Sequence, residues 1–136
     1  MKEDKKAFGN VASLKGQKIL ITGGLGFIGS NLAHRCLELG AEVTIYDCLN
    51  PHSGGNLYNI HEIKDSIELL FYDILDFNCI SQSIVGKEIV FNCAASTSHT
   101  FSMKEPLNDV DMNIRGSINL LEAIRRFNKE VKLVHI

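Results

Sequence analysis

The stretch Lys18–Gly29, which reads KILITGGLGFIG, decides the fold. Its apolar run ILI is too short for a helix and is typical of a buried strand. Glycines follow, and an amphipathic segment begins at Phe27. Gly24, Gly26 and Gly29 have the spacing that lets the backbone turn tightly and approach a pyrophosphate at a helix N-terminus. The stretch therefore predicts a strand, a dinucleotide-binding turn and a helix; a glycine turn without a ligand is the alternative.

An acidic residue stands where a second cofactor contact is expected. The apolar run Glu42–Tyr46 ends at Asp47, roughly 20 residues after the glycine turn. A carboxylate at this point accepts hydrogen bonds from ribose hydroxyls and repels a 2′-phosphate, so it favours NAD over NADP. No arginine lies between Asp47 and Ile60 to bind such a phosphate. An aspartate in a solvated turn at the strand end is the alternative.

Strand and helix patterns alternate along the rest of the chain. This alternation predicts an α/β fold with right-handed crossovers and a doubly wound parallel sheet (Rossmann) of about five strands in the order 3-2-1-4-5. We expect strands at 18–22, 42–46, 67–72, 88–92 and 132–136, helices at 27–39, 76–85 and 106–127, and a helical turn at 57–63. The domain is expected to span residues 17–136, after a flexible lead at 1–16.

Apolar residues at helical spacing predict which helix faces are packed. For the first helix these residues are Ile28, Leu32, Cys36 and Leu39. For the longest helix they are Val110, Ile114, Ser117, Leu121 and Ile124. The Ser/Thr-rich segment 96–102 is expected to be a loop, and the irregular segment 50–65 is long enough to predict a functional loop.

Composition excludes several classes of partner. Fourteen basic and sixteen acidic side chains leave a net charge of −2, which gives no electrostatic reason to expect nucleic acid. The four cysteines form no C-x-x-C pair and have no metal-ligand spacing with the histidines, so we expect reduced thiols and no metal. No apolar run reaches membrane-spanning length, and the charged start lacks a signal-peptide core. These features predict a cytoplasmic protein without a membrane partner.

Two later strand ends carry further candidates. Asp73 follows the third strand and could accept a hydrogen bond from an adenine amino group, with Ile74 beside it. Helix capping is the alternative for Asp73. Ala94 and Ala95 follow the fourth strand, where small side chains let a flat cofactor pass close to the backbone; plain packing is the alternative.

These motifs occur in one order along the sequence. They are Thr22-Gly23-x-x-Gly26-x-x-Gly29, Asp47, Asp73-Ile74, Ala94-Ala95, Pro106-Leu107 and Asn113-x-x-Gly116. Over residues 18–136 this ordered set resembles the N-terminal half of an extended short-chain dehydrogenase/reductase. The branch that it resembles most is that of NAD-dependent nucleotide-sugar epimerases and dehydratases, similar to the UDP-glucose 4-epimerases.

The resemblance implies a cofactor site. Asp47 would bind the adenosine ribose, Asp73 and Ile74 the adenine, and Asn113 would lie near the nicotinamide. The residues that it places along the pyrophosphate and the middle of the cofactor are Gly23, Gly26, Phe27, Ile28, Gly29, Ala94, Ala95 and Thr97. Family members usually have a histidine where Asn92 stands, and we expect this departure to be tolerated.

The main departure from the family concerns catalysis. The family's Tyr-x-x-x-Lys and its partner Ser or Thr follow the fifth strand, and none of the three tyrosines here has a lysine four residues later. We therefore expect no catalytic residue: the chain would be an NAD-binding half, truncated before the base and the substrate domain and inactive alone.

If the chain is only the NAD-binding half, this also determines which partners we expect. A nucleotide sugar would bind only with the C-terminal half, and the long helix and the last strand would form a homodimer or larger assembly. The alternative is a non-catalytic dinucleotide-binding or structural fragment that assembles with itself or with a partner.

Overall fold

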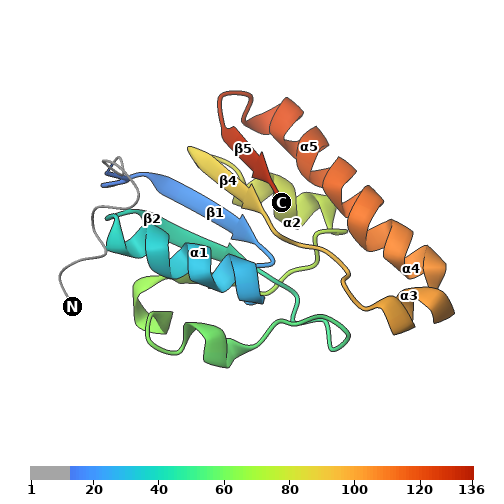
Figure 1. Ribbon diagram of the computed structural model, residues 1–136. Helices are drawn as coiled ribbons and strands as arrows, with labels where there is room; N and C mark the ends of the chain where they lie inside the picture. The colour runs from blue at the N-terminus through green and yellow to red at the C-terminus, as the bar shows by residue number, and fades with distance from the viewer. Residues whose placement is uncertain (1–12) are drawn as a thin grey trace.

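A five-stranded parallel sheet forms the centre of the computed structural model, which describes residues 13–136 (Figure 1). The strands are β1 (Lys18–Thr22), β2 (Glu42–Tyr46), β3 (Glu68–Leu70), β4 (Ile89–Asn92) and β5 (Lys132–His135). Every neighbouring pair is parallel, and the order is β3-β2-β1-β4-β5. The predicted doubly wound α/β fold and its strand order are confirmed.

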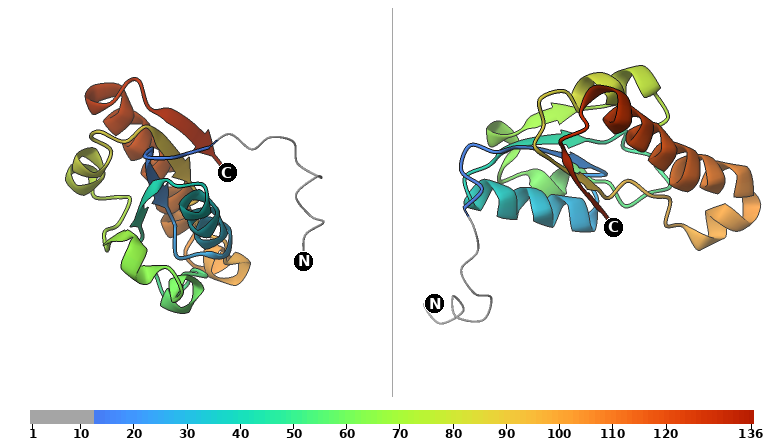
Figure 2. Two further views of the ribbon diagram at one scale, coloured as in Figure 1. Left: turned by 90° about the vertical axis from the view of Figure 1, so that its left-hand side faces the viewer. Right: turned by 90° about the horizontal axis from the view of Figure 1, so that it is seen from above.

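Helices cover both faces of the sheet (Figure 2). Helix α1 (Phe27–Glu38) packs on one face, and α2 (Phe77–Ser83) and α5 (Gly116–Phe127) pack on the other. The remaining elements are the 3₁₀ turns η2 (Leu57–Ile60) and η3 (Lys64–Ser66), the helices α3 (His99–Lys104) and α4 (Pro106–Val110), and the π-helical turn η4 (Asp111–Arg115). The turn η4 joins α4 to α5 without a break, so the predicted long helix contains one π turn.

Strand β1 is buried on both sides, which explains its continuous apolar run. Ile19 and Ile21 contribute to a core beneath α1, whereas Leu20 points to the opposite face and packs with Val90 and Leu120. Successive side chains of a strand alternate between faces, so one short strand supports both cores. The two cores fix the register of the glycine turn that follows β1.

The predicted packed face of α1 is wrong at its first turn. The buried residues of α1 are Gly29, Ser30, Ala33 and Cys36, whereas Ile28 is half exposed. Small residues face the sheet because α1 lies close to the glycine turn: a Cβ on Gly29 would come within 2.7 Å of the Cα of Gly24. Ile28 lies instead on a side of α1 that is open to solvent.

The predicted face of the longest helix is wrong in part, although its last member, Ile124, does pack against the core. Met112, Gly116, Leu120 and Ala123 are buried, while Val110, Ile114 and Leu121 are exposed. Gly116 contacts Ile74 so closely that a Cβ would lie 2.6 Å from its methyl group. The helix therefore carries two apolar stripes, and its smaller residues face the sheet.

Three local differences concern the segments between these elements. The expected loop 96–102 contains the start of α3, whose N-cap Ser98 accepts a hydrogen bond from the amide of Phe101 at 3.4 Å. Strand β3 is shorter than predicted, and the expected turn at 57–63 is the shorter η2. Of the expected flexible lead, residues 1–12 lie outside the described part; Leu14 and Gly16 donate backbone hydrogen bonds to Leu39 and Gly40 at the end of α1.

Candidate functional site

A cavity of about 300 Å³ opens at the carboxyl ends of the central strands. In doubly wound sheets, ligands bind outside these ends, where the strand order reverses. The predicted site residues that line the cavity are Gly23, Gly26, Phe27, Ile28, Gly29, Asp47, Ile74, Ala94, Ala95 and Thr97. Asp73 and Asn113 do not line it. The structure thus brings together segments that are far apart in the sequence.

The glycine turn shapes the floor of the cavity. Gly23 has a φ of +64°, and a Cβ there would lie 2.6 to 2.7 Å from the backbone of Cys93 and Ala94. The N-cap residue of α1, Gly26, has no side chain to cap the helix. The first amide groups of α1 are therefore free to donate to an anion, and the partial positive charge of the helix end favours one.

Asp47 connects the glycine turn to the loop after β2. Its carboxylate accepts a hydrogen bond from the amide of Leu25 at 3.0 Å and another from the amide of Leu49 at 2.8 Å. Each carboxylate oxygen has a second lone pair, so Asp47 can still accept hydrogen bonds from a ligand in the cavity. The contact with Leu49 also holds that residue at a φ of 51°, a conformation uncommon for non-glycine residues.

Asp73 and Asn113 do not line the cavity, but each is hydrogen-bonded to segments next to residues that do. Asp73 accepts the amide of Leu75 at 2.9 Å, and its carbonyl accepts the hydroxyl of Tyr46 at 2.8 Å. Asn113, on the π turn η4, accepts the amide of Ser96 at 2.8 Å and donates to the carbonyl of Ser96 at 3.3 Å. Asn113 therefore fixes the segment that presents Thr97 to the cavity.

A buried polar network links three strand ends beside the cavity. Thr22 donates to the side-chain oxygen of Asn92 at 2.5 Å, and the amide nitrogen of Asn92 lies 2.9 Å from Nδ1 of His135. Asn92 is 1% exposed, so its polar atoms need these partners. This pairing explains how asparagine fits at the position where the sequence resemblance expects histidine.

Several lining residues escaped the sequence analysis. They are Tyr46, Cys48, Asn50, Ser53, Gly54, Gly55, Tyr72, Cys93 and Met112. The turn signals of the long segment after β2 indicated part of this set, because long ordered loops are often functional. The rings of His52 and Phe101 also stack, with centres 4.0 Å apart and planes 12° apart, so this loop contacts α3.

The thiol of Cys93 gives a chemical test of this environment. Burial raises the pKa of Cys93 to about 11. Because only the thiolate is alkylated, we expect iodoacetamide at pH 8 to label Cys93 roughly 100-fold more slowly than an ordinary thiol. Peptide mass spectrometry measures this rate. In the urea-unfolded chain the rate is expected to be ordinary; equal rates in the folded and unfolded chain would contradict the burial of this thiol.

Two kinds of feature are not found among the residues that the structure describes. Among residues 13–136, no cluster of three His, Cys, Asp or Glu side chains is placed to hold a metal ion. Within the same residues, no helix has the length and apolar character needed to cross a membrane.

Comparison with known proteins gives consistent matches. A family model described as GDP-mannose 4,6 dehydratase matches residues 20–136. The CDP-paratose 2-epimerase of Salmonella typhi is 33% identical over 122 residues, which cover 87% of this chain and 36% of that protein.

Solved structures agree with this match. The epimerase Mth375 from Methanothermobacter thermautotrophicus has a TM-score of 0.79 and 31% identity, over 90% of this chain and 35% of that one. The UDP-glucose-4-epimerase from Stenotrophomonas maltophila, crystallised with bound NAD and formylated UDP-arabinopyranose, has a TM-score of 0.76 and 29% identity, over 88% and 36%. The chain thus spans about a third of the length of these relatives.

Proposed function

The chain belongs to the GDP-mannose 4,6 dehydratase family, a branch of the extended short-chain dehydrogenases/reductases, and we propose that it is the NAD-binding part of a nucleotide-sugar epimerase or dehydratase. The observation that carries the proposal is one cavity that joins the glycine turn after β1 to Asp47 at the end of β2. The free amides at the start of α1 would bind the pyrophosphate, and Asp47 would bind the adenosine ribose.

The shape of the cavity fits such a cofactor. Gly23 and Gly29 leave no room for side chains, so backbone forms the floor where a pyrophosphate would lie. Ala94 and Ala95 form a low wall, and Thr97 stands beside them. NAD bound there would supply a hydride acceptor for a sugar substrate.

We assign no proton transfer to residues of this chain. The sequence contains no Tyr-x-x-x-Lys, the pair that supplies the base in this family. We therefore propose turnover of a nucleotide sugar only for this part combined with a C-terminal half that carries the base and the sugar pocket. A cytoplasmic location accords with four unpaired cysteines, because thiols persist in a reducing compartment.

A calorimetric titration with NAD and NADP tests the proposal. We expect saturable binding of NAD and weaker binding of NADP, because the carboxylate of Asp47 repels a 2′-phosphate. Absence of NAD binding by the folded chain would contradict the proposal and favour the alternative, a structural fragment that assembles with a partner.

We also propose that the chain forms a homodimer through α4 and α5. Large apolar side chains at helical spacing are exposed along one stripe of these helices: Leu107, Val110, Ile114, Ile118 and Leu121. The charged neighbours of the stripe pair within their own helix, as Glu122 does with Arg125 and Arg126 at 2.6 Å. A second copy of the stripe would cover the first, because contiguous exposed apolar side chains favour association.

Charges placed in the stripe are expected to separate the dimer. Light scattering should give a dimer mass for the natural chain and about half of that mass for the Ile114→Asp, Leu121→Asp double variant, because a buried unpaired charge is costly. The matched control is Val85→Asp, a change of an exposed apolar residue two positions after the end of α2. A monomer for the natural chain at high concentration would contradict the proposal.

A further inference from the structure

One end of the cavity lies where β2 and β3 finish side by side. The amide of Asp47 donates to the carbonyl of Leu70 at 3.0 Å, so the residues that follow β3 adjoin Asp47. Tyr72 is two residues beyond Leu70 and lines the cavity with Ile74 and Cys48. A ligand that places a ribose at Asp47 therefore meets Tyr72 with the group beyond that ribose.

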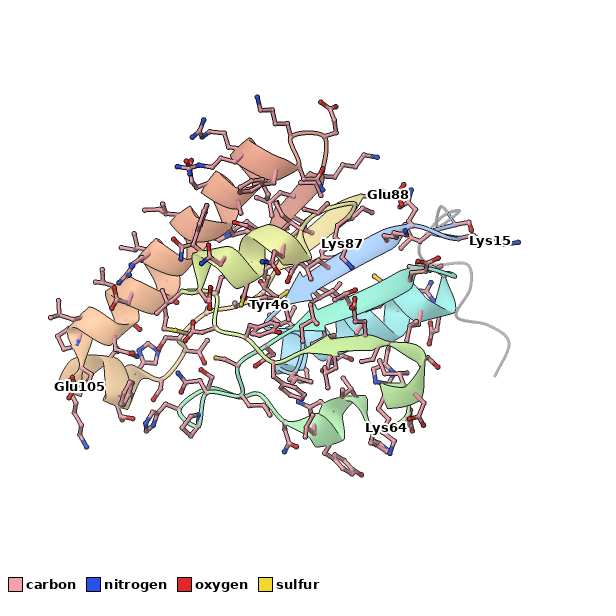
Figure 3. All side chains as sticks on the ribbon, turned by 180° about the vertical axis from the view of Figure 1, so that it is seen from behind. Lys15, Tyr46, Lys64, Lys87, Glu88 and Glu105 are labelled. Carbon is pink, nitrogen blue, oxygen red and sulfur yellow. The ribbon has the colours of Figure 1, made fainter. Side chains whose placement is uncertain are left out.

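The ring of Tyr72 lies beside the ring of Tyr46, and both residues line the cavity. Its centre lies 6.0 Å from the ring of Tyr46, and the two planes are tilted by 43°. Tyr46 is fully buried among the residues between the sheet and α2, and its hydroxyl is bound to the carbonyl of Asp73 (Figure 3). Because Tyr46 is fixed, the neighbouring ring of Tyr72 has a firm support on that side.

Tyr72 is partly in solvent, and it borders both the cavity and a second hollow beside Cys79 and Gln82 of α2. Its side chain is 46% exposed, although it stands beside an apolar lining. When a flat ring covers an aromatic ring that is exposed to water, the burial of apolar surface lowers the free energy. Stacking of a base on the aromatic side chain lowers it further.

We propose that Tyr72 is the aromatic wall of the adenine subsite, and that its ring contacts the purine of the cofactor. This inference rests on the proposed function, because it extends the NAD site by one specificity-determining residue. Asp47 would then select the ribose, and Tyr72 would select a flat base beyond it. The nicotinamide end of the cofactor would not touch Tyr72.

Titrations with AMP, ADP-ribose, NAD and nicotinamide mononucleotide test the assignment. Alanine substitution of an aromatic group that stacks on a base costs roughly 1 to 3 kcal/mol, so we expect Tyr72→Ala to bind the three adenine ligands about 5- to 160-fold more weakly. Binding of nicotinamide mononucleotide is expected to be unchanged. Tyr72→Phe keeps the ring and is expected to bind all four ligands within about twofold of the natural chain.

Tyr58→Ala is the matched control. Tyr58 is also an exposed tyrosine, but it lies on η2, stacks on His61 and does not line the cavity. We expect it to leave all four affinities unchanged. Circular dichroism of each variant checks that the fold is kept.

Tyrosine fluorescence gives a second test. If Tyr72 only supported the fold, its replacement by Phe would not change the quenching of tyrosine emission by AMP. The chain has three tyrosines and no tryptophan. AMP is expected to quench the emission of the natural chain, and Tyr72→Phe is expected to lose most of this quenching while it keeps its affinity for AMP.

The outcomes separate the role of Tyr72 from the proposed function. NAD binding that is equal in the natural chain and in Tyr72→Ala would overturn the role of Tyr72 and leave the cofactor site standing. AMP binding that depends on Tyr72, without NAD binding, would support the purine wall and overturn the proposed function. Absence of binding of any adenine ligand would overturn both, and would indicate that another protein segment covers Tyr72.

Discussion

Gly23→Ala is expected to lower the free energy of unfolding by about 2 to 5 kcal/mol. A side chain at a positive φ costs roughly 1 to 2 kcal/mol, and overpacking adds about 1 to 3 kcal/mol. Both penalties apply, because Gly23 has a φ of +64° and its Cβ would lie within 2.7 Å of the backbone of Cys93 and Ala94. Backbone atoms cannot rotate away as a side chain can. Urea unfolding followed by circular dichroism measures the loss.

Gly16→Ala separates the two penalties. Gly16 has a similar φ of +74°, but a Cβ there meets nothing within 4 Å. Only the conformational penalty applies, so we expect a loss of about 1 to 2 kcal/mol. Equal losses for the two variants would show that the close approach of the turn to the end of β4 does not determine stability. A larger loss for Gly23→Ala is expected together with loss of NAD binding, because the turn would be displaced.

Asp47→Ala is expected to weaken NAD binding about 10- to 100-fold. Hydrogen bonds to a charged group contribute roughly 1.5 to 3 kcal/mol, and the ribose hydroxyls would lose this acceptor. The affinity for NADP is expected to fall much less, because the repulsion of the 2′-phosphate disappears with the carboxylate. The preference for NAD over NADP, measured by calorimetry, is therefore expected to decrease.

Two controls separate ligand binding from support of the loop. The carboxylate of Asp47 also binds the amides of Leu25 and Leu49, so the alanine variant is expected to be less stable by about 1 to 3 kcal/mol. Asp47→Asn retains an acceptor oxygen and removes the charge, so it is expected to lose selectivity with a smaller loss of stability. An unchanged ratio of NAD to NADP affinity in both variants would refute the contact between Asp47 and the ribose.

The sequence was sufficient to predict the sheet and the edge of the sheet at which the cavity opens. The short apolar run before Thr22 and the glycines after it predicted β1 and its turn, because both depend on local sterics. The alternation of strands and helices then predicted the strand order through the handedness of the crossovers. These rules act within or between neighbouring elements, so one sequence suffices to apply them.

The helix faces and part of the cavity lining could not be predicted in this way. Helical spacing identifies a stripe, but α5 has two stripes, and the close contact of Gly116 with Ile74 decides which of them faces the sheet. Tyr72 reads as the end of a strand until the packing of Tyr46 beside it is known. The partners of Asp47 lie on two different turns. Each of these features depends on contacts between distant segments, which no local pattern records.

The π turn at Asp111–Arg115 places one residue more in this segment than an α-helical turn would hold. The deletion of one residue here would restore regular α-helix, so α4 and α5 would keep their alignment and the apolar stripe would stay continuous. The hydrogen bonds of Asn113 to Ser96 come from within this turn, so its support of the loop after β4 depends on the extra residue. A relative that lacks one residue here is therefore expected to keep the stripe and to support that loop in a different way.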